Sequence, residues 1–403
     1  MPRVRVVTSS LLALLLVLLL AACSSSNSSS TTGSLAVTVG GLPSGLNGVV
    51  AVTMGGYAHT VSATATLSGL APGTYTIAPQ TVSLRRNAFN GSASSGTVTV
   101  SAGNTASVSV SYSAQRGDLW VVDYNASALS MFAAGSLESS PAPSFTFSTG
   151  LNGPDSAAVD AAGNLWVTNI NNSTVVKYSA STLTSSPGVA ATISTGLNGP
   201  EDEAFDAAGN LWVVNNGTST VVEYAAASLT SSPGVAATIS TGLNVPVHLA
   251  FDAAGNLWVT NYNSSTVVEY AAASLTSSPG VAATISTGLN HPEGLAFDTS
   301  GNLWVGNQGV DAVVRYAAAS LTSSPSPTAT ITTGANPAGV ALDVNGNLWV
   351  THQGTATAVE EFAAADIAAT GSYTPTAAAT IGGFSNAQQA VFDPPPYNLP
   401  MSR

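Results

Sequence analysis

Short segments that alternate apolar and polar residues fill the chain between Ser34 and Ala114. The alternation is clearest over 35–39, 49–53, 97–100 and 107–111, and Gly, Pro and Asn separate these segments. A period of two residues is typical of strands with one buried face, and frequent turns between such strands are typical of a β-sandwich. The pattern therefore predicts a small β-sandwich over residues 34–114.

Beyond Arg116 the chain repeats itself. Its six tryptophans are 46 residues apart, except for a last interval of 45, and each follows a leucine: Trp120, Trp166, Trp212, Trp258, Trp304 and Trp349. Around five of them the string is Asp-x-x-Gly-Asn-Leu-Trp-Val, and β-forming segments follow it. Each repeat thus holds about four short strands, which is the content of one propeller blade.

The two ends of the repeat region decide between a closed ring and an open solenoid. The first repeat opens at Gly117 with no leading strand before its tryptophan, whereas the chain closes with a segment, 390–393, that matches this missing strand. A sheet shared by both ends closes a ring and leaves only short, protected edges. We therefore expect an all-β protein in which a six-bladed β-propeller, residues 115–403, follows the sandwich.

Composition narrows the choice of partners. The formal net charge is -12, and only 7% of the residues are charged. Nucleic-acid binding depends on neutralising phosphates, so this chain would meet net repulsion. We expect no nucleic-acid partner.

The amino terminus predicts export. Arg3 and Arg5 precede a short apolar run, and a Leu-Ala-Ala-Cys string ends at Cys23. A positive start, an apolar run and small residues form a secretory signal, here residues 1–22. The string resembles the lipobox of bacterial lipoproteins, which implies diacylation of Cys23. The alternative is an ordinary signal peptide with an incidental cysteine.

The lipobox resemblance implies a place for the protein. Two or three acyl chains would hold it at a membrane, at the outer membrane or the cell surface, while the polypeptide stays in water. Residues 23–33 are rich in Ser, Asn and Thr and would form a flexible tether. The expected partner at this end is therefore the membrane itself.

Two further motifs resemble known families. The Leu-x-Pro-Gly-x-Tyr string over 70–75 resembles the prealbumin-type modules related to carboxypeptidase-regulatory domains, which implies a β-sandwich. The string from Pro292 to Val305, Pro-x-Gly-x-Ala-x-Asp-x-x-Gly-Asn-Leu-Trp-Val, resembles NHL repeats and, more loosely, gluconolactonase and streptogramin-lyase propellers. Those relatives include binding scaffolds, lactonases and lyases, so the resemblance implies architecture and not one activity.

Residues that all repeats share are most simply explained by folding. We expect the tryptophans to pack between blades. We expect the aspartates before Gly-Asn to cap a turn by accepting hydrogen bonds from its backbone, with calcium binding as the alternative for this row. They are Asp160, Asp206, Asp252, Asp298 and Asp343.

Two positions that could carry function lie at one end of the first two strands. The residue after the proline that opens the first strand varies between repeats: Asp155, Glu201, Val247, Glu293, Ala338 and Gln388. The residue 14 positions later is polar in every repeat: Asn169, Asn215, Asn261, Asn307 and His352, with Asp123 as its equivalent in the first. In an antiparallel hairpin the two positions would lie opposite each other. We therefore expect both rows to meet around the mouth of the central channel.

This convergence suggests a binding rim and a cation site. The amide row with His352 and Asp123 would form the rim, and Asp155, Glu201 and Glu293 would hold a hard cation, with Ca²⁺ as the first candidate because it prefers carboxylate and amide oxygens. In gluconolactonases the residue after this proline supplies metal ligands, and Glu293 matches that place best. The alternative is a polar, water-filled rim without a metal.

The first functional hypothesis is binding of a small molecule, glycan or protein at the propeller face. The second is a metal-dependent hydrolase of lactones or small esters, in which the metal polarises a carbonyl and Glu293 is required. The third is a purely structural surface protein. Streptogramin lyases carry Trp-Phe-Thr-Glu where this chain has Trp-Val-Thr-Asn. His248, His291 and His352 share no spacing, so we interpret them as scattered rim residues and not as a zinc site.

Overall fold

The computed structural model describes residues 31–393, apart from 43–44, 85–86, 115, 140, 184–185, 230–232, 276–278, 323 and 355–357. The predicted signal segment and Cys23 lie outside the described residues. The described chain divides into two compact units, one of residues 31–81 and 91–112, the other of residues 82–90 and 113–393. No helix in this part of the chain is both long and apolar enough to span a bilayer.

Two sheets contain the strands of the first unit, together with residues 82–90 of β6 and β7. One has the order β4-β1-β9-β7-β6 and the other β3-β2-β5-β8. Their strands are β1 Gly33–Gly40, β2 Val50–Met54, β3 Tyr57–Val61, β4 Ala65–Leu70, β5 Gly73–Pro79, β6 Val82–Leu84, β7 Asn87–Ala93, β8 Thr97–Val100 and β9 Thr105–Ala114. Alternate residues such as Leu35, Val37, Val50, Val52 and Ile77 are buried, as the period of two predicts.

The second unit contains six sheets, which we call blades 1 to 6. Blade 1 consists of β10 Asp118–Asp123, β11 Ala128–Phe132, β12 Phe145–Phe147 and the last strand, β34 Ala387–Asp393. Blade 2 consists of β13 Pro154–Val159, β14 Leu165–Asn169, β15 Thr174–Tyr178 and β16 Val189–Ile193. Blade 3 consists of β17 Pro200–Phe205, β18 Leu211–Asn215, β19 Thr220–Tyr224 and β20 Ala237–Ile239.

The other three blades follow the same plan. Blade 4 consists of β21 Pro246–Phe251, β22 Leu257–Asn261, β23 Thr266–Tyr270 and β24 Ala283–Ile285. Blade 5 consists of β25 Pro292–Phe297, β26 Leu303–Asn307, β27 Ala312–Tyr316, β28 Ala329–Thr332 and an added parallel strand, β32 Gly371–Tyr373. Blade 6 consists of β29 Pro337–Leu342, β30 Leu348–His352, β31 Ala358–Phe362 and β33 Ala379–Gly382.

Short 3-10 helices connect some of these strands. They are η1 Ala134–Ser139, η2 Ala180–Thr182, η3 Asn216–Thr218, η4 Ala226–Ser228, η5 Ala272–Ser274, η6 Gln308–Val310 and η7 Ala318–Ser320. The Ala-Ala-Ser turns recur because blades 3, 4 and 5 share the sequence that follows their third strand.

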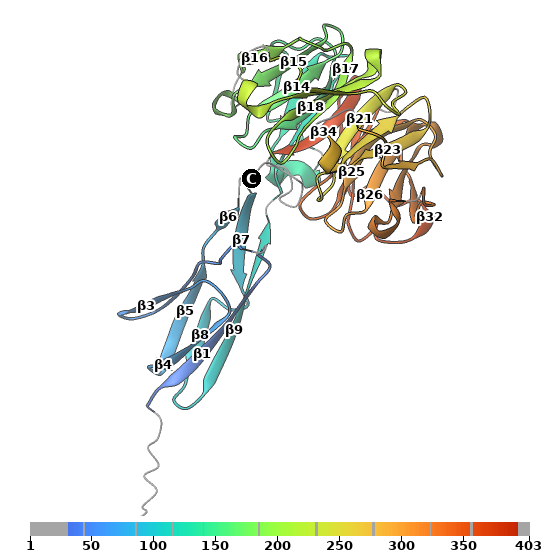
Figure 1. Cartoon of the computed structure of the whole chain (residues 1–403). Helices are drawn as coiled ribbons and strands as arrows, with labels where there is room; N and C mark the ends of the chain where they lie inside the picture. Colours follow the sequence, from blue (N-terminus) through green and yellow to red (C-terminus); the bar gives the residue numbers. More distant parts are fainter. Residues whose placement is uncertain are drawn as a thin grey trace, which may run out of the picture. The chain divides into compact units, whose positions relative to one another are not determined.

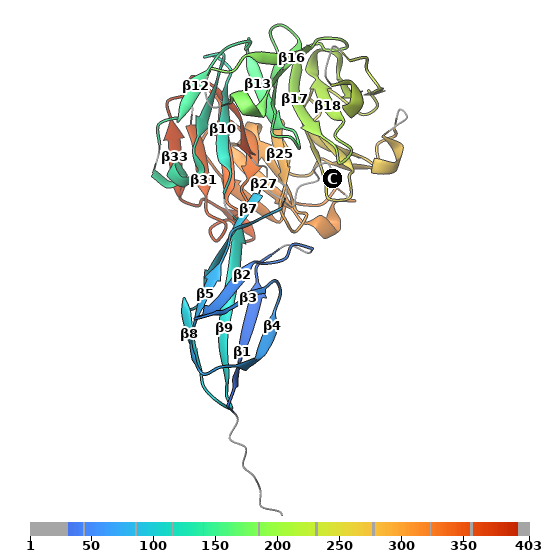
Figure 2. The ribbon, with the colours of Figure 1, turned by 90° about the vertical axis from the view of Figure 1, so that its left-hand side faces the viewer.

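The last strand closes the ring. β34 pairs antiparallel with β10, from Asp118 opposite Asp393 to Asp123 opposite Ala387. The innermost strands β34, β13, β17, β21, β25 and β29 contact one another in this order, and β29 contacts β34 again. Figure 1 shows β34, in red, among the green strands of earlier blades, and Figure 2 shows β10 and β12 beside β31 and β33. The predicted six-bladed β-propeller is confirmed.

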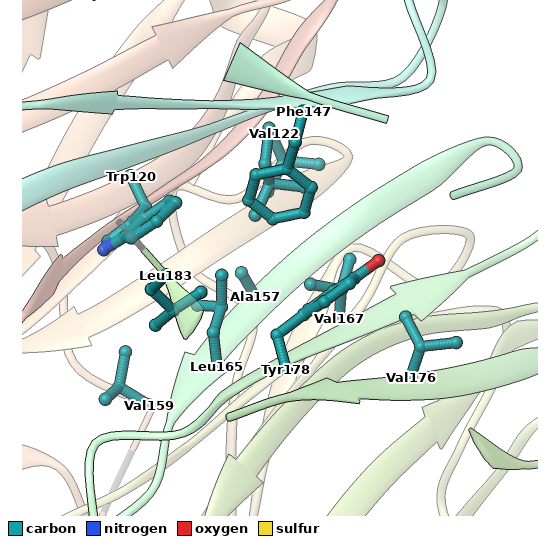
Figure 3. Close-up of a cluster of buried hydrophobic side chains, with 11 residues drawn as sticks. Trp120, Val122, Phe147, Ala157, Val159, Leu165, Val167, Val176, Tyr178 and Leu183 are labelled. Atoms are coloured by element: carbon teal, nitrogen blue, oxygen red, sulfur yellow. The ribbon is translucent and has the colours of Figure 1, made fainter. Parts of the chain in front are cut away.

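Tryptophans join each blade to the next, as predicted. Trp120 of blade 1 packs against Ala157, Val159 and Leu165 of blade 2, with Tyr178 and Phe147 nearby (Figure 3). At the seam of the ring, Trp349 of blade 6 belongs to one buried cluster with Leu119 and Val121 of blade 1. The same apolar contact therefore closes the ring and builds every other blade interface.

The aspartate row caps turns, also as predicted. Asp160 Oδ1 accepts hydrogen bonds from the backbone N–H groups of Ala162 and Asn164, at 3.0 and 2.8 Å. Its Oδ2 accepts one from the indole N–H of Trp166, at 3.0 Å. The other four aspartates of the row repeat this arrangement, so the row fixes both the turn and the tryptophan.

Candidate binding site at the channel mouth

A bulge sets the direction of the side chains at the start of each innermost strand. In blade 2, Pro154 lies opposite Asn169 and Ala157 opposite Val167, so three steps on β13 match two on β14. Blades 3 to 6 contain the same irregularity. The predicted pairing of Asp155 with Asn169 is therefore wrong by one residue, because a bulge inserts one unpaired residue and turns the strand.

The amide row does not form a rim. Asn169, Asn215, Asn261 and Asn307 are fully buried. In blade 4, Asn261 Oδ1 accepts a hydrogen bond from the N–H of Asn244 at 2.9 Å, and its Nδ2 donates to the carbonyl of Gly242 at 3.1 Å. These asparagines hold the loop that leads into their own blade. The prediction that they bind a ligand is wrong, because their polar groups are already bonded to backbone.

The two other members of that row have the same structural role. His352 Nδ1 lies 3.1 Å from the carbonyl of Ala335, and its Nε2 lies 3.0 Å from Glu360 Oε2. Asp123 accepts hydrogen bonds from the backbone N–H groups of Ser385 and Asn386, at 2.7 and 3.0 Å. Because Ser385 and Asn386 precede β34, Asp123 fastens the closing strand and is not free to bind a ligand.

The three acidic residues do converge at one end of the channel. Asp155 and Glu293 are buried, Glu201 is half-buried, and each is close enough to influence the charge of the others. Burial raises the pKa of Asp155 to about 7, and His248 partly opposes this change. Burial also raises the pKa of Glu293 to about 7, again opposed by His248, and that of Glu201 to about 10. Much of this acidic cluster is therefore protonated at neutral pH.

A buried histidine lies among these carboxyl groups. His248 Nδ1 is 3.3 Å from Asp202 Oδ2, and its Nε2 is 4.0 Å from Glu293 Oε2. Burial alone would lower the pKa of His248, but Asp202, Glu293 and Asp155 outweigh it and raise the pKa to about 9. His248 is thus the cation of the cluster, and the interpretation of it as a scattered rim residue is wrong.

Asp202 connects three blades at this point. Its Oδ1 accepts a 2.5 Å hydrogen bond from the hydroxyl of Ser156 in blade 2, and its Oδ2 accepts one from the N–H of Leu249 in blade 4 at 2.8 Å. With the contact to His248, every oxygen of this carboxylate has a partner. Asp202 therefore ties blades 2, 3 and 4 together and places its negative charge next to His248.

Polar side chains of blades 4, 5, 6 and 1 form a chain of hydrogen bonds at the same end of the channel. Tyr262 donates a 2.8 Å hydrogen bond to Gln308 Oε1, and Gln308 Nε2 donates to Gln353 Oε1 at 3.2 Å. Gln353 in turn donates to Gln388. The ring of Tyr262 stacks on His291 with centroids 4.5 Å apart. We call Tyr262, Gln308, Gln353 and Gln388 the polar rim; all four are half-buried.

The polar rim borders the cluster at Tyr262. Burial, together with the charge of Glu293, raises the pKa of Tyr262. Arg116, Lys177 and Arg315, the described basic residues of the propeller, lie instead over Trp349, Trp166 and Trp304. Hence His248 supplies the positive charge that the cluster receives within the described part of the chain.

The site does not provide the predicted calcium ligands. Within the described residues, no three His, Cys, Asp or Glu side chains are placed to hold a metal ion. Asp155 and Glu201 come from the neighbouring blades 2 and 3, whereas Glu293 comes from blade 5, opposite blade 2 in the ring. They influence one another through charge and do not form the coordination set that the sequence suggested.

Comparison with known proteins addresses the fold. No family model and no curated protein matches the chain. A chain in a crystal structure of a nidogen/laminin complex is similar over 68% of this chain and 97% of its own, with a TM-score of 0.52 and 16% identity. A protein of unknown function from Bacteroides caccae is similar over 68% of this chain and 98% of its own, with a TM-score of 0.52 and 13% identity. These likenesses concern the β-propeller.

A weaker similarity is to virginiamycin B lyase from Staphylococcus aureus. It covers 53% of this chain and 67% of the lyase, with a TM-score of 0.40 and 11% identity. At such identities the comparisons establish the propeller fold alone. The chemistry of the channel mouth has to be argued from its own residues.

The sequence did not single out two further positions as candidates for the site. One is the second residue after the proline that opens an innermost strand, and the other is the residue that follows each member of the amide row. The first row reads Ser156, Asp202, His248, Gly294, Gly339 and Gln389, and the second reads Tyr124, Ile170, Asn216, Tyr262, Gln308 and Gln353. Both rows vary between repeats as strongly as the acidic row. Their variation was the available signal, but the bulge that aims them at the channel is not visible in the sequence.

Proposed function

We propose that this protein is an exported binding protein whose propeller takes a small, uncharged, hydroxyl-rich ligand, such as the end of a glycan, at the channel mouth. The observation that carries the proposal is the buried group of His248, Asp202, Glu293 and Asp155 beneath the polar rim. A few convergent polar groups are the usual basis of orientation and specificity in ligand recognition.

The chemistry of the site favours hydroxyl groups. A hydroxyl both donates and accepts hydrogen bonds, and so do carboxamides and protonated carboxyl groups. Gln308, Gln353 and Gln388 supply the first kind of group, and Glu201 with a pKa of about 10 supplies the second. The ring of Tyr262 adds an apolar surface next to these polar groups. An anion would meet the negative charge of Asp202 and of the ionised fraction of Asp155 and Glu293.

The experiment is calorimetric titration of the protein with neutral mono- and disaccharides, with spermidine and glucuronate as charged probes. We expect a neutral saccharide to bind and Tyr262→Ala to weaken binding by about tenfold. The matched control is Tyr124→Ala, at the same position of blade 1, where the hydroxyl donates to Asn171 and not to the polar rim. Binding of spermidine alone, or equal loss in both variants, would contradict the ligand class or the site.

We also propose that the chain is anchored to a membrane by lipid on Cys23. The support is the Leu-Ala-Ala-Cys string after an apolar run that follows Arg3 and Arg5. Metabolic labelling with palmitate should mark the parent protein and not a Cys23→Ser variant, and that variant should leave the membrane fraction. An unlabelled parent protein would refute the anchor without affecting the binding proposal.

A second candidate function is hydrolysis of small esters or lactones at the same cluster. It is favoured by the pKa of Asp155 and Glu293, both about 7, because a general acid or base works best when its pKa is close to the working pH. His248, with a pKa of about 9, is protonated at neutral pH and would orient or stabilise charge. A lactone hydrolysis assay separates the two functions. Turnover that Glu293→Gln abolishes would support the enzyme, whereas absence of turnover would contradict hydrolysis and leave the binding proposal unaffected.

A further inference from the structure

The propeller contains a second candidate site at the other end of its channel. All six innermost strands enclose an axial cavity of about 230 Å³. Its lining includes Thr299, an exposed residue of the turn after β25, so the cavity reaches solvent there. The polar rim lies at the start of the innermost strands and this turn lies at their end. Asp202 of the acidic cluster also lines the cavity, so the two sites adjoin at this residue.

The cavity exists because one row of side chains is small. The fourth residue after the bulged proline is alanine in five blades and valine in the sixth: Ala158, Ala204, Ala250, Ala296, Ala341 and Val391. The next residue is larger and apolar: Val159, Phe205, Phe251, Phe297, Leu342 and Phe392. All of these residues line the cavity. Its walls are thus mostly hydrocarbon.

Four carboxyl groups interrupt this apolar wall, those of Asp202, Glu203, Asp298 and Asp343. The three aspartates accept hydrogen bonds from neighbouring protein groups. Glu203 lines the cavity and is only 3% exposed. In the other blades the same position is apolar: Ala157, Leu249, Leu295, Val340 and Ala390. Each of these five apolar residues belongs to the buried cluster between its own blade and the preceding one. The cluster between blades 2 and 3 has no apolar residue at this position, because Glu203 occupies it.

The carboxyl group of Glu203 lacks a well-formed hydrogen bond. Neither of its oxygens has a partner with hydrogen-bond geometry, although the hydroxyl of Thr168 and the backbone of Ala158 are close enough to lower its pKa. Burial raises the pKa of Glu203 well above its usual range, and the charge of Asp202 adds to this effect. Burial therefore favours the neutral carboxylic acid, which can donate one hydrogen bond and accept another. Leaving such a group unpaired in a buried place is costly.

We propose that the axial cavity binds a compact, uncharged, mostly apolar molecule that carries one hydroxyl or carbonyl group, and that Glu203 makes the hydrogen bond to that group. The size is suitable, since an apolar cavity of about 150 Å³ accepts benzene, and 230 Å³ leaves room for a substituted ring. A charged ligand does not fit, because the oxygens of Asp202, Asp298 and Asp343 are already bonded within the protein and the Ala and Phe side chains of the lining cannot solvate an ion.

The test uses p-cresol and toluene, which differ by one hydroxyl group, in calorimetric titrations of the whole protein at pH 7. We expect p-cresol to bind about three- to tenfold more tightly than toluene, the effect of one hydrogen bond in a buried site. Glu203→Leu places in blade 3 the residue that blades 4 and 5 already have, so the variant should fold. It should bind toluene at least as tightly as p-cresol.

A second variant locates the binding. Ala250→Leu adds bulk to the lining and should weaken both probes, whereas Tyr262→Ala at the channel mouth should change neither. Absence of binding by both probes, or an unchanged preference for p-cresol in Glu203→Leu, would overturn the proposal. Binding that Ala250→Leu leaves intact would place the probes outside the cavity and would overturn it as well.

Discussion

Replacing Asp202 by Asn should destabilise the propeller and change its pH dependence. The carboxylate accepts hydrogen bonds from Ser156 and Leu249 and lies 3.3 Å from His248. An asparagine has nearly the same shape but loses the charge, and it offers one acceptor oxygen where the carboxylate offers two. Removing one member of a buried charged pair costs about 3–5 kcal/mol. We expect a loss of this size at pH 7.

The pH dependence follows from the direction of the pKa shift. His248 has a pKa of about 9 in the folded protein instead of 6.5, so folding favours its proton by about 3 kcal/mol. This stabilisation is fully present below pH 6.5 and is lost as the pH rises through about 9. Asp202 contributes most to keeping the proton on His248. In Asp202→Asn the fall in stability between pH 7 and 9 should therefore become much smaller.

Urea unfolding measured at several pH values tests this expectation. Tryptophan fluorescence reports on the propeller alone, because all six tryptophans lie in it. Ser156→Ala is the control: it removes one hydrogen bond to Asp202, should cost about 1 kcal/mol, and should leave the pH dependence intact. Asp202→Asn within about 1 kcal/mol of the parent, or with the parent's slope above pH 7, would refute the role given to this carboxylate.

Three other expectations concern the frame. Asn261→Ala leaves two backbone groups unbonded and should lower the free energy of unfolding in urea by about 2–4 kcal/mol. Asn263 is exposed, so Asn263→Ala should be neutral. Equal effects of the two substitutions would contradict the structural role given to the buried amide row. Val245 has a φ of 53°, and the equivalent residue of the preceding blade is Gly199. Val245→Gly should therefore be neutral or stabilising, whereas Gly199→Val should cost about 1–2 kcal/mol of stability. Melting temperatures of the two variants test this expectation. Deleting β34 should abolish cooperative melting, and a cooperative truncated protein would show that closure is dispensable.

The repeat architecture was predictable because its signals are local. The spacing of Trp120 and its counterparts sets the size of a blade, and a turn capped by Asp160 needs only the next few residues. Closure was predictable for a related reason, since β34 has the sequence that the first repeat lacks. The convergence of Asp155, Glu201 and Glu293 followed from this closure, because equivalent positions of a ring share one end of the axis.

The roles of individual side chains were not predictable in this way. A bulge of one residue after Pro154 decides which side chains point into the channel, and no periodicity in the sequence marks it. The sequence suggested that the amide row binds a ligand, whereas its side chains bond to backbone groups. Residue type alone does not distinguish an asparagine with a structural role from one that binds a ligand.

By itself, the sequence determined the number of blades, their closure into a ring and the end at which acidic groups gather. Only the tertiary structure brought His248 to Asp202 from a neighbouring blade and left Glu203 beside an apolar cavity. Blade-forming preferences arise within some 45 consecutive residues, whereas these contacts join strands of different repeats. Their distances depend on the diameter of the ring and on the bulge, which are properties of the packed molecule.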